Sequence, residues 1–107
     1  MDISRPLAPA ALHILLALGD GPSHGYGVLQ AVRERAIPLG TGSLYRHLSK
    51  LMQAGLVAEV PASSPSDPRR GVSYRITPRG RRALGAERDR LAALLGSLDA
   101  ARRKGSA

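Results

Sequence analysis

The side chains of this chain that could do chemistry are mostly arginines. Among its 107 residues, 16 Lys and Arg outnumber 8 Asp and Glu and give a formal net charge of +8. All of these cations except Lys50 and Lys104 are arginines. A surplus of this size favours a polyanionic partner, either nucleic acid or an anionic membrane surface. GC-rich coding alone also produces many arginines and alanines, so the positions of the arginines must decide.

The composition excludes several kinds of chemistry. The chain has no Cys, which removes disulfides, thiolate catalysis and Cys-based zinc sites. His13, His24 and His47 have no third ligand at a metal-binding spacing, and no nucleophile is paired with a base in the manner of an active site. We therefore expect no catalytic residues, no metal, no cofactor and no enzyme activity.

The densest group of cations lies between residues 69 and 82, which contain no acidic residue. Its members are Arg69, Arg70, Arg75, Arg79, Arg81 and Arg82. Segments 56–60 and 71–77 have strand chemistry, and in the second apolar and polar residues alternate. A long, proline-rich loop joins them. We predict a β-hairpin with arginines at its tip and on its return strand, where the wing of a DNA-binding domain meets phosphates.

Three short helices are expected before this hairpin. The first follows Pro9 and spans the apolar run 10–18. This run is too short to cross a bilayer, which takes about 20 residues, and no signal cleavage site follows it, so it indicates a core helix of a cytoplasmic protein. Ser23 is expected to cap a second helix that ends near Arg35. The third begins near residues 41–43 and ends at Gly55 as a C-cap.

The third helix has an apolar face and an opposite face of hydrogen-bond donors. Leu44, Leu48, Leu51 and Met52 form the apolar stripe at helical spacing. Arginine on the outer face suits bidentate contacts with guanine, and small residues in the first turn leave backbone amides free for a phosphate. The residues expected to contact DNA from this helix are Gly42, Ser43, Tyr45, Arg46, Ser49 and Lys50. Those expected to contact it from the wing are Arg69, Arg70 and Arg75.

Each of these residues has an ordinary explanation when taken singly. Arg46 and Lys50 alone are more often solvated charges than base contacts. Tyr45, at the edge of the stripe, fits packing with its hydroxyl in water as well as it fits a phosphate contact. The combination of helix face, wing and the helix that follows favours DNA binding.

A long C-terminal helix follows the hairpin. Thr77 and Pro78 are a typical cap and first residue, and the helix can extend to about Arg103. Its leucine stripe is too long for a small domain to cover, so we expect the same helix of a second copy to cover it in a two-fold dimer. The residues of this stripe are Leu84, Leu91, Leu94, Leu95 and Leu98. The predicted fold class is mainly α with a small β-hairpin. We expect a winged helix-turn-helix domain (1–77) and a dimerisation helix (78–104) that form one compact unit, followed by a short tail (105–107).

Segments 24–32, 40–60 and 73–84 together resemble the PadR family of transcriptional regulators. The most specific parts are His24-Gly25-Tyr26, Leu44-Tyr45, residues 54–57 and residues 74–80, and the likeness covers about residues 10–98. The resemblance implies a winged-helix dimer of the short type, usually a repressor, with the recognition helix at 42–54, the wing at 57–76 and a single C-terminal helix that makes the dimer.

The resemblance also implies that a small aromatic or drug-like inducer, bound near the dimer interface, lowers DNA affinity. The chain has no Phe or Trp to stack on a planar ligand, which disfavours that type of site. Ser43 and Arg46 stand where relatives often have Thr and a smaller residue or Pro, so no operator preference is carried over.

The favoured hypothesis is a cytoplasmic, homodimeric, sequence-specific DNA-binding regulator, a repressor relieved by a small-molecule ligand. Its partner is double-stranded DNA with a pseudo-palindromic operator, whose half-sites would lie one helical turn, roughly 34 Å, apart. The alternative is a winged-helix protein–protein interaction module without specific DNA binding, in which the arginines serve solubility. A membrane-surface role is disfavoured because the core and the dimer stripe account for the apolar residues.

Overall fold

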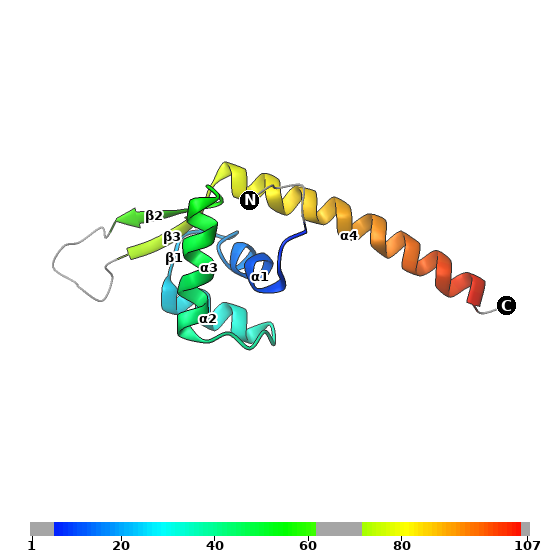
Figure 1. Cartoon of the computed structure of the whole chain (residues 1–107), viewed down its shortest axis with the longest axis horizontal. Coiled ribbons are helices and arrows are strands. Elements are labelled where there is room, and N and C mark those ends of the chain that lie inside the picture. Colours follow the sequence, from blue (N-terminus) through cyan, green and yellow to red (C-terminus); the bar gives the residue numbers. More distant parts are fainter. Residues whose placement is uncertain (1–5, 62–71, 106–107) are drawn as a thin grey trace.

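Three short helices, a small sheet and one long helix make up the fold (Figure 1). The structure is a computed structural model, and it describes residues 6–61 and 72–105. The elements in chain order are α1 (Pro9–Ala17), β1 (Ser23–His24), α2 (Gly25–Glu34), α3 (Thr41–Gln53), β2 (Val57–Pro61), β3 (Val72–Ile76) and α4 (Pro78–Gly105). The predicted fold class, mainly α with a small hairpin, is confirmed.

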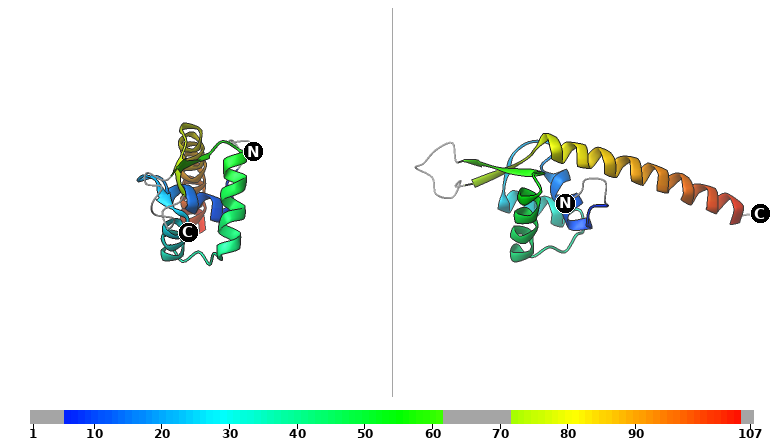
Figure 2. Two further views of the ribbon diagram at one scale, coloured as in Figure 1. Left: turned by 90° about the vertical axis from the view of Figure 1, so that its left-hand side faces the viewer. Right: turned by 45° about the horizontal axis from the view of Figure 1, so that its top comes forward.

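The core lies between α1, α2 and α3. Ile14 and Leu15 of α1 are fully buried. The three leucines of the predicted α3 stripe are also buried, because residues spaced three and four apart lie on one side of a helix, and Met52 is partly buried against the core. In the absence of Phe and Trp, leucine and valine side chains fill the centre of the domain. This packing leaves α3 at one edge of the helical cluster (Figure 2, left).

The sheet has three antiparallel strands in the order β1-β3-β2, one more than the predicted hairpin. Ser23 pairs with Tyr74 and His24 with Ser73. The expectation that Ser23 caps α2 is therefore wrong: its backbone is extended in β1, and His24 is the N-cap residue. The pairing partner of Ser23 lies some fifty residues further along the chain, and no local pattern signals such a pairing.

The junction between α3 and β2 is set by Gly55, as predicted. Gly55 has φ +77°, in the left-handed region that glycine adopts without strain. Its amide donates to the carbonyl of Met52 at 3.0 Å, and the amide of Leu56 donates to that of Leu51 at 2.9 Å. These two bonds form a Schellman motif, which ends α3 and sends the chain into the wing.

The first turn of α4 is tied to the end of α3 through Thr77. The Thr77 hydroxyl accepts a bond from the amide of Gly80 at 3.0 Å, as the predicted cap, and donates to the carbonyl of Gly55 at 2.6 Å. Gly80 packs so closely that a β-carbon there would collide with the carbonyl oxygen of Leu56. From this anchor α4 leaves the helical cluster as a long rod (Figure 1; Figure 2, right). Among the described residues, no helix is long and apolar enough to cross a membrane.

Candidate nucleic-acid interface

The outer face of α3 presents donors to solvent. Arg46, Ser49 and Lys50 are exposed, whereas Leu44 and Leu48 anchor the opposite face in the core. The first turn of α3 contains no acidic residue, and no side chain caps it. Its free amides and the positive end of the helix dipole are therefore available to an anion.

Arg46 is held in position by its own helix. Its Nη2 donates to the Ser43 hydroxyl at 2.9 Å, one turn earlier. A guanidinium has five N–H groups in a planar fork, so this bond orients the side chain and leaves other donors for a base or a phosphate. Gly42, also predicted to contact DNA, is exposed beside Ser43 in the same turn.

Tyr45 is half-exposed, at 47%, and lies against the start of α2. A β-carbon on Gly25 would lie 2.5 Å from the Tyr45 hydroxyl oxygen, so the absence of a side chain at Gly25 makes this approach possible. Burial first, and then the nearby Tyr45 and Glu59, raise the pKa of the Tyr74 phenol in β3. The first turn of α3 and the start of α2 therefore meet at Tyr45.

The wing presents Arg75 on its outer face. In β3, Tyr74 and Ile76 are buried and Arg75 between them is exposed, as the alternation of a strand requires. Arg75 pairs with Ala58 of β2. Arg69 and Arg70, the other two predicted wing contacts, lie outside the described residues.

Further arginines lie in the first turns of α4. Arg79, Arg81 and Arg82 are exposed, and Arg81 donates to the carbonyl of Gly19 at 3.3 Å. The first turn has no acidic residue. Cations at the positive end of a helix do not stabilise it, so these arginines raise the positive potential next to the wing without a structural benefit from the dipole.

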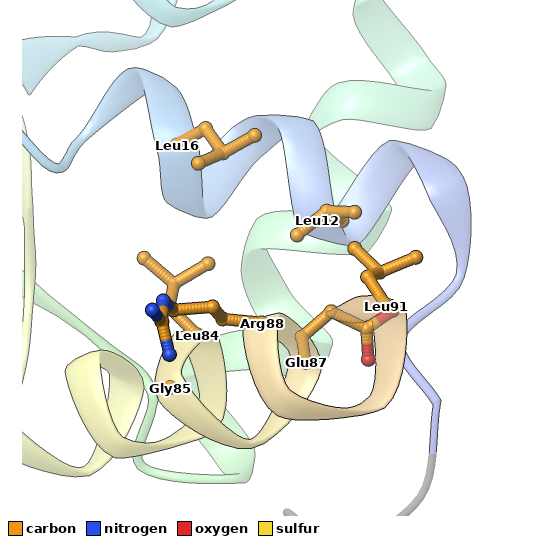
Figure 3. A pocket seen from close by; sticks show the side chains of 7 residues that line it. All are labelled: Leu12, Leu16, Leu84, Gly85, Glu87, Arg88 and Leu91. Carbon is orange, nitrogen blue, oxygen red and sulfur yellow. The ribbon is translucent and has the colours of Figure 1, made fainter. Parts of the chain in front are cut away.

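The leucine stripe of α4 is exposed along its outer half. Leu91, Leu94, Leu95 and Leu98 are 43%, 48%, 59% and 60% exposed. Leu84, nearer the domain, packs against the core. Leu84 and Leu91 of α4 face Leu12 and Leu16 of α1 across a mostly apolar cavity of about 480 Å³ (Figure 3).

Glu87 lies at the edge of this cavity and was not singled out from the sequence. It is 3% exposed, accepts a bond from the Leu7 amide at 3.4 Å and forms an ion pair with Arg90. The hydrogen bond from Arg90, with a smaller contribution from the Leu7 amide, holds the pKa of Glu87 below its usual value against the effect of burial. The one available signal was its spacing, three residues after Leu84 and four before Leu91, which places it on the buried face.

In the part of the chain that the structure describes, no group of three or more His, Cys, Asp or Glu side chains could hold a metal ion. A donor-bearing third helix, an exposed arginine on the wing and an arginine-rich helix start are typical of a winged helix-turn-helix DNA-binding protein.

The comparison with protein families agrees. Residues 14–86 match the model of the Transcriptional regulator PadR-like family, and the chain belongs to this family. It is a PadR-like transcriptional regulator, which implies DNA binding, and it is not an enzyme.

Individual relatives support the same fold. A PadR family transcription regulator from Clostridium difficile R20291 matches with a TM-score of 0.76 and 20% identity over 86% of this chain and 96% of that one. A PadR-like transcription factor from Bacteroides fragilis matches with a TM-score of 0.73 and 22% identity, over 83% of this chain and 85% of that one. An uncharacterized 37.1 kDa protein in transposon TN4556 of Streptomyces fradiae is 35% identical over 88 residues. That match covers 81% of this chain and 24% of the relative, so the chain spans about a quarter of the relative's length.

Proposed function

We propose that this PadR-like regulator acts in the cytoplasm as a homodimer that binds a pseudo-palindromic operator and represses transcription until a small molecule releases it. The observation that carries the proposal is the outer face of α3, where Arg46, Ser49 and Lys50 are exposed and the first turn has no acid. Such a face is suited to the major groove of double-stranded DNA.

The proposed contacts are supported by the exposure of these side chains. Arg46, oriented by Ser43, would contact a base edge, and the exposed Ser49 and Lys50 of the same helix would contact the groove beside it. Tyr45 and the amides at Gly42 would hold the phosphate at the rim of the groove. Arg75 on the wing, with Arg69 and Arg70, would hold the backbone on the other side of α3.

The homodimer is supported by the continuity of one face of α4. With Leu91 at 0° and about 100° per residue, the core-packed Leu84 falls near 20° and the exposed Leu95 near 40°. The face that packs on the domain in the first turns therefore continues without a partner along the outer turns, and a second copy of α4 would cover it. Residues 1–77 would then be the DNA-binding unit and 78–104 the dimerisation helix.

Relief by a ligand is supported by the cavity between α1 and α4. Its volume, about 480 Å³, is within the range of about 300–1,000 Å³ typical of small-molecule sites. Its walls are largely leucine side chains (Figure 3), so they suit an apolar ligand. A molecule between these helices would change the direction of α4 and with it the spacing of the two recognition helices.

Selection of duplexes from a random library by the purified protein tests the proposal. On a selected duplex, Arg46→Ala is expected to lose discrimination at one base pair per half-site by about 5- to 150-fold. Arg75→Ala should weaken binding to all sequences and lower the salt slope by about two, one contact from each copy. Lys104→Ala, which removes the same charge in the last turn of α4, is the control and should change neither.

Two outcomes would contradict the proposal. If no sequence is enriched, or if the protein binds another protein in a salt-insensitive complex and leaves DNA free at low salt, the chain is an interaction module. If Arg46→Ala and Arg75→Ala both leave a specific complex unchanged, the docking of α3 and the wing is wrong.

A further inference from the structure

Tyr26 is an exposed aromatic residue that neither the core nor the contacts proposed above explain. Among the described residues, no large hydrophobic side chain is more exposed than Tyr26, at 69%. It is the second residue of α2 and lies beside the first turn of α3. We propose that Tyr26, oriented by Gln30, donates a hydrogen bond to a DNA phosphate next to the recognition helix. This inference rests on the proposed binding of DNA.

The hydroxyl of Tyr26 is prepared to act as a donor. Gln30, one turn later in α2, donates from Nε2 to the Tyr26 hydroxyl oxygen at 2.6 Å. A phenol has one proton and can also accept. Since the Tyr26 oxygen accepts the bond that Gln30 donates, the hydroxyl proton of Tyr26 stays available for an outside acceptor. A phosphate oxygen can only accept, so the pair matches a phosphodiester better than it matches a donor group.

The position of Tyr26 brings this donor to the proposed path of the DNA backbone. Tyr26 shares a hollow of about 80 Å³ with Tyr45 and Thr41 of α3. A strand whose phosphate meets the first turn of α3 therefore passes beside Tyr26. The first turns of both helices lack acidic residues, so no carboxylate repels the strand there.

The position of the Tyr45 hydroxyl beside the start of α2 depends on Gly25. Any side chain at position 25 would displace the Tyr45 hydroxyl, because a β-carbon would lie 2.5 Å from its oxygen. With glycine there, Tyr45 and Tyr26 flank one hollow and can contact the same strand. Tyr26 thus extends the proposed interface from α3 to α2 with a neutral, directional contact.

A neutral phosphate contact has a recognisable signature. It holds the backbone without sequence information, so its loss weakens binding to every sequence equally. It releases no counterion, so the salt dependence stays the same. This combination separates Tyr26 from a base contact, which changes specificity, and from an arginine contact, which changes the salt slope.

Tyr26→Phe tests the inference, because it removes the hydroxyl and keeps the ring. Fluorescence anisotropy with the full chain would be measured on a duplex selected by the wild-type protein and on a scrambled duplex. We expect binding to both to weaken by about 5- to 20-fold, with the salt slope and the melting temperature unchanged. Gln30→Ala should weaken binding less, and should add nothing in the Tyr26→Phe background.

Single methylphosphonate substitutions in the selected duplex identify the phosphate. At one position in each half-site, the losses from the methylphosphonate and from Tyr26→Phe should not add. The inference is overturned if Tyr26→Phe binds both duplexes like the wild type, or if its loss is confined to the selected duplex. If the wild-type protein binds neither duplex, the proposed function fails and this inference fails with it. If the wild-type protein binds and Tyr26→Phe binds equally well, only this inference fails.

Discussion

Truncation of Leu95 to alanine tests whether the exposed leucine face of α4 is a dimer interface. Leu95 is 59% exposed in the single chain. Full burial of a leucine side chain stabilises by about 1.5–3 kcal/mol, so burial of the exposed part in a dimer contributes about 1–2 kcal/mol per copy. A two-fold interface contains the residue twice. Because alanine keeps the β-carbon, we expect a loss near the lower limit, about 2 kcal/mol per dimer, or roughly a thirtyfold rise in the dimer Kd.

Sedimentation velocity over a range of protein concentrations measures this Kd. Alanine is at least as good a helix former as leucine, so circular dichroism should show that α4 is retained. A change in Kd therefore reports the contact and not the helix.

A pair of charged variants provides the matched control. Leu95→Glu places a carboxylate on the stripe and should give a monomer. Ala93→Glu places the same charge about 160° away around the helix and should dimerise like the wild type. The reasoning is refuted if the wild-type protein is a monomer at all concentrations, or if Ala93→Glu disrupts the dimer as much as Leu95→Glu does.

Three further predictions concern stability. The hydrogen bond from Arg90 is the chief cause of the lowered folded-state pKa of Glu87. The stability that the Glu87 carboxylate contributes is therefore present above the unfolded pKa of about 4.3 and is lost as the pH falls through the lower folded value. In urea denaturation, Glu87→Gln should be less stable than the wild type at pH 7, and the difference should narrow towards pH 3. Gly80→Ala places a β-carbon against the Leu56 carbonyl and should lower the free energy of unfolding by about 1–3 kcal/mol. In the control Gly96→Ala, the new β-carbon meets no atom within 4 Å, so this variant should be neutral or stabilising by up to about 1 kcal/mol. Equal losses in both variants would contradict the close-packing explanation. Leu48→Ala, at a fully buried position, should cost about 2–5 kcal/mol in the same assay, and a loss under 1 kcal/mol would show that α3 is not anchored there.

The helices could be predicted closely because their signals are local. Leu44, Leu48 and Leu51 repeat at the helical period, and Gly55 ends α3 as its position suggested. Thr77 caps α4 as predicted, although α4 continues to Gly105, slightly beyond the expected end. Periodicity and capping depend on residues a few positions apart, so a linear sequence contains them.

The candidate site was predictable only in part. The donor face of α3 and the exposure of Arg75 follow from helical and strand periodicity. The bond between Arg46 and Ser43 and the one between Gln30 and Tyr26 depend on rotamers, which periodicity does not specify. In the sequence, Tyr26 was only part of a family motif. The structure makes it a candidate DNA contact because it places Tyr26 beside Tyr45.

Composition and periodicity alone established a basic, mainly helical chain with a donor-bearing third helix and an uncovered leucine stripe. Only the tertiary structure could show that Ser23 joins the sheet as β1, that Gly25 admits Tyr45, and that Glu87 is buried against the Leu7 amide. Each of these contacts joins residues at least twenty positions apart. Their energies depend on how the packed elements meet in three dimensions, and no pattern of neighbouring residues records that arrangement.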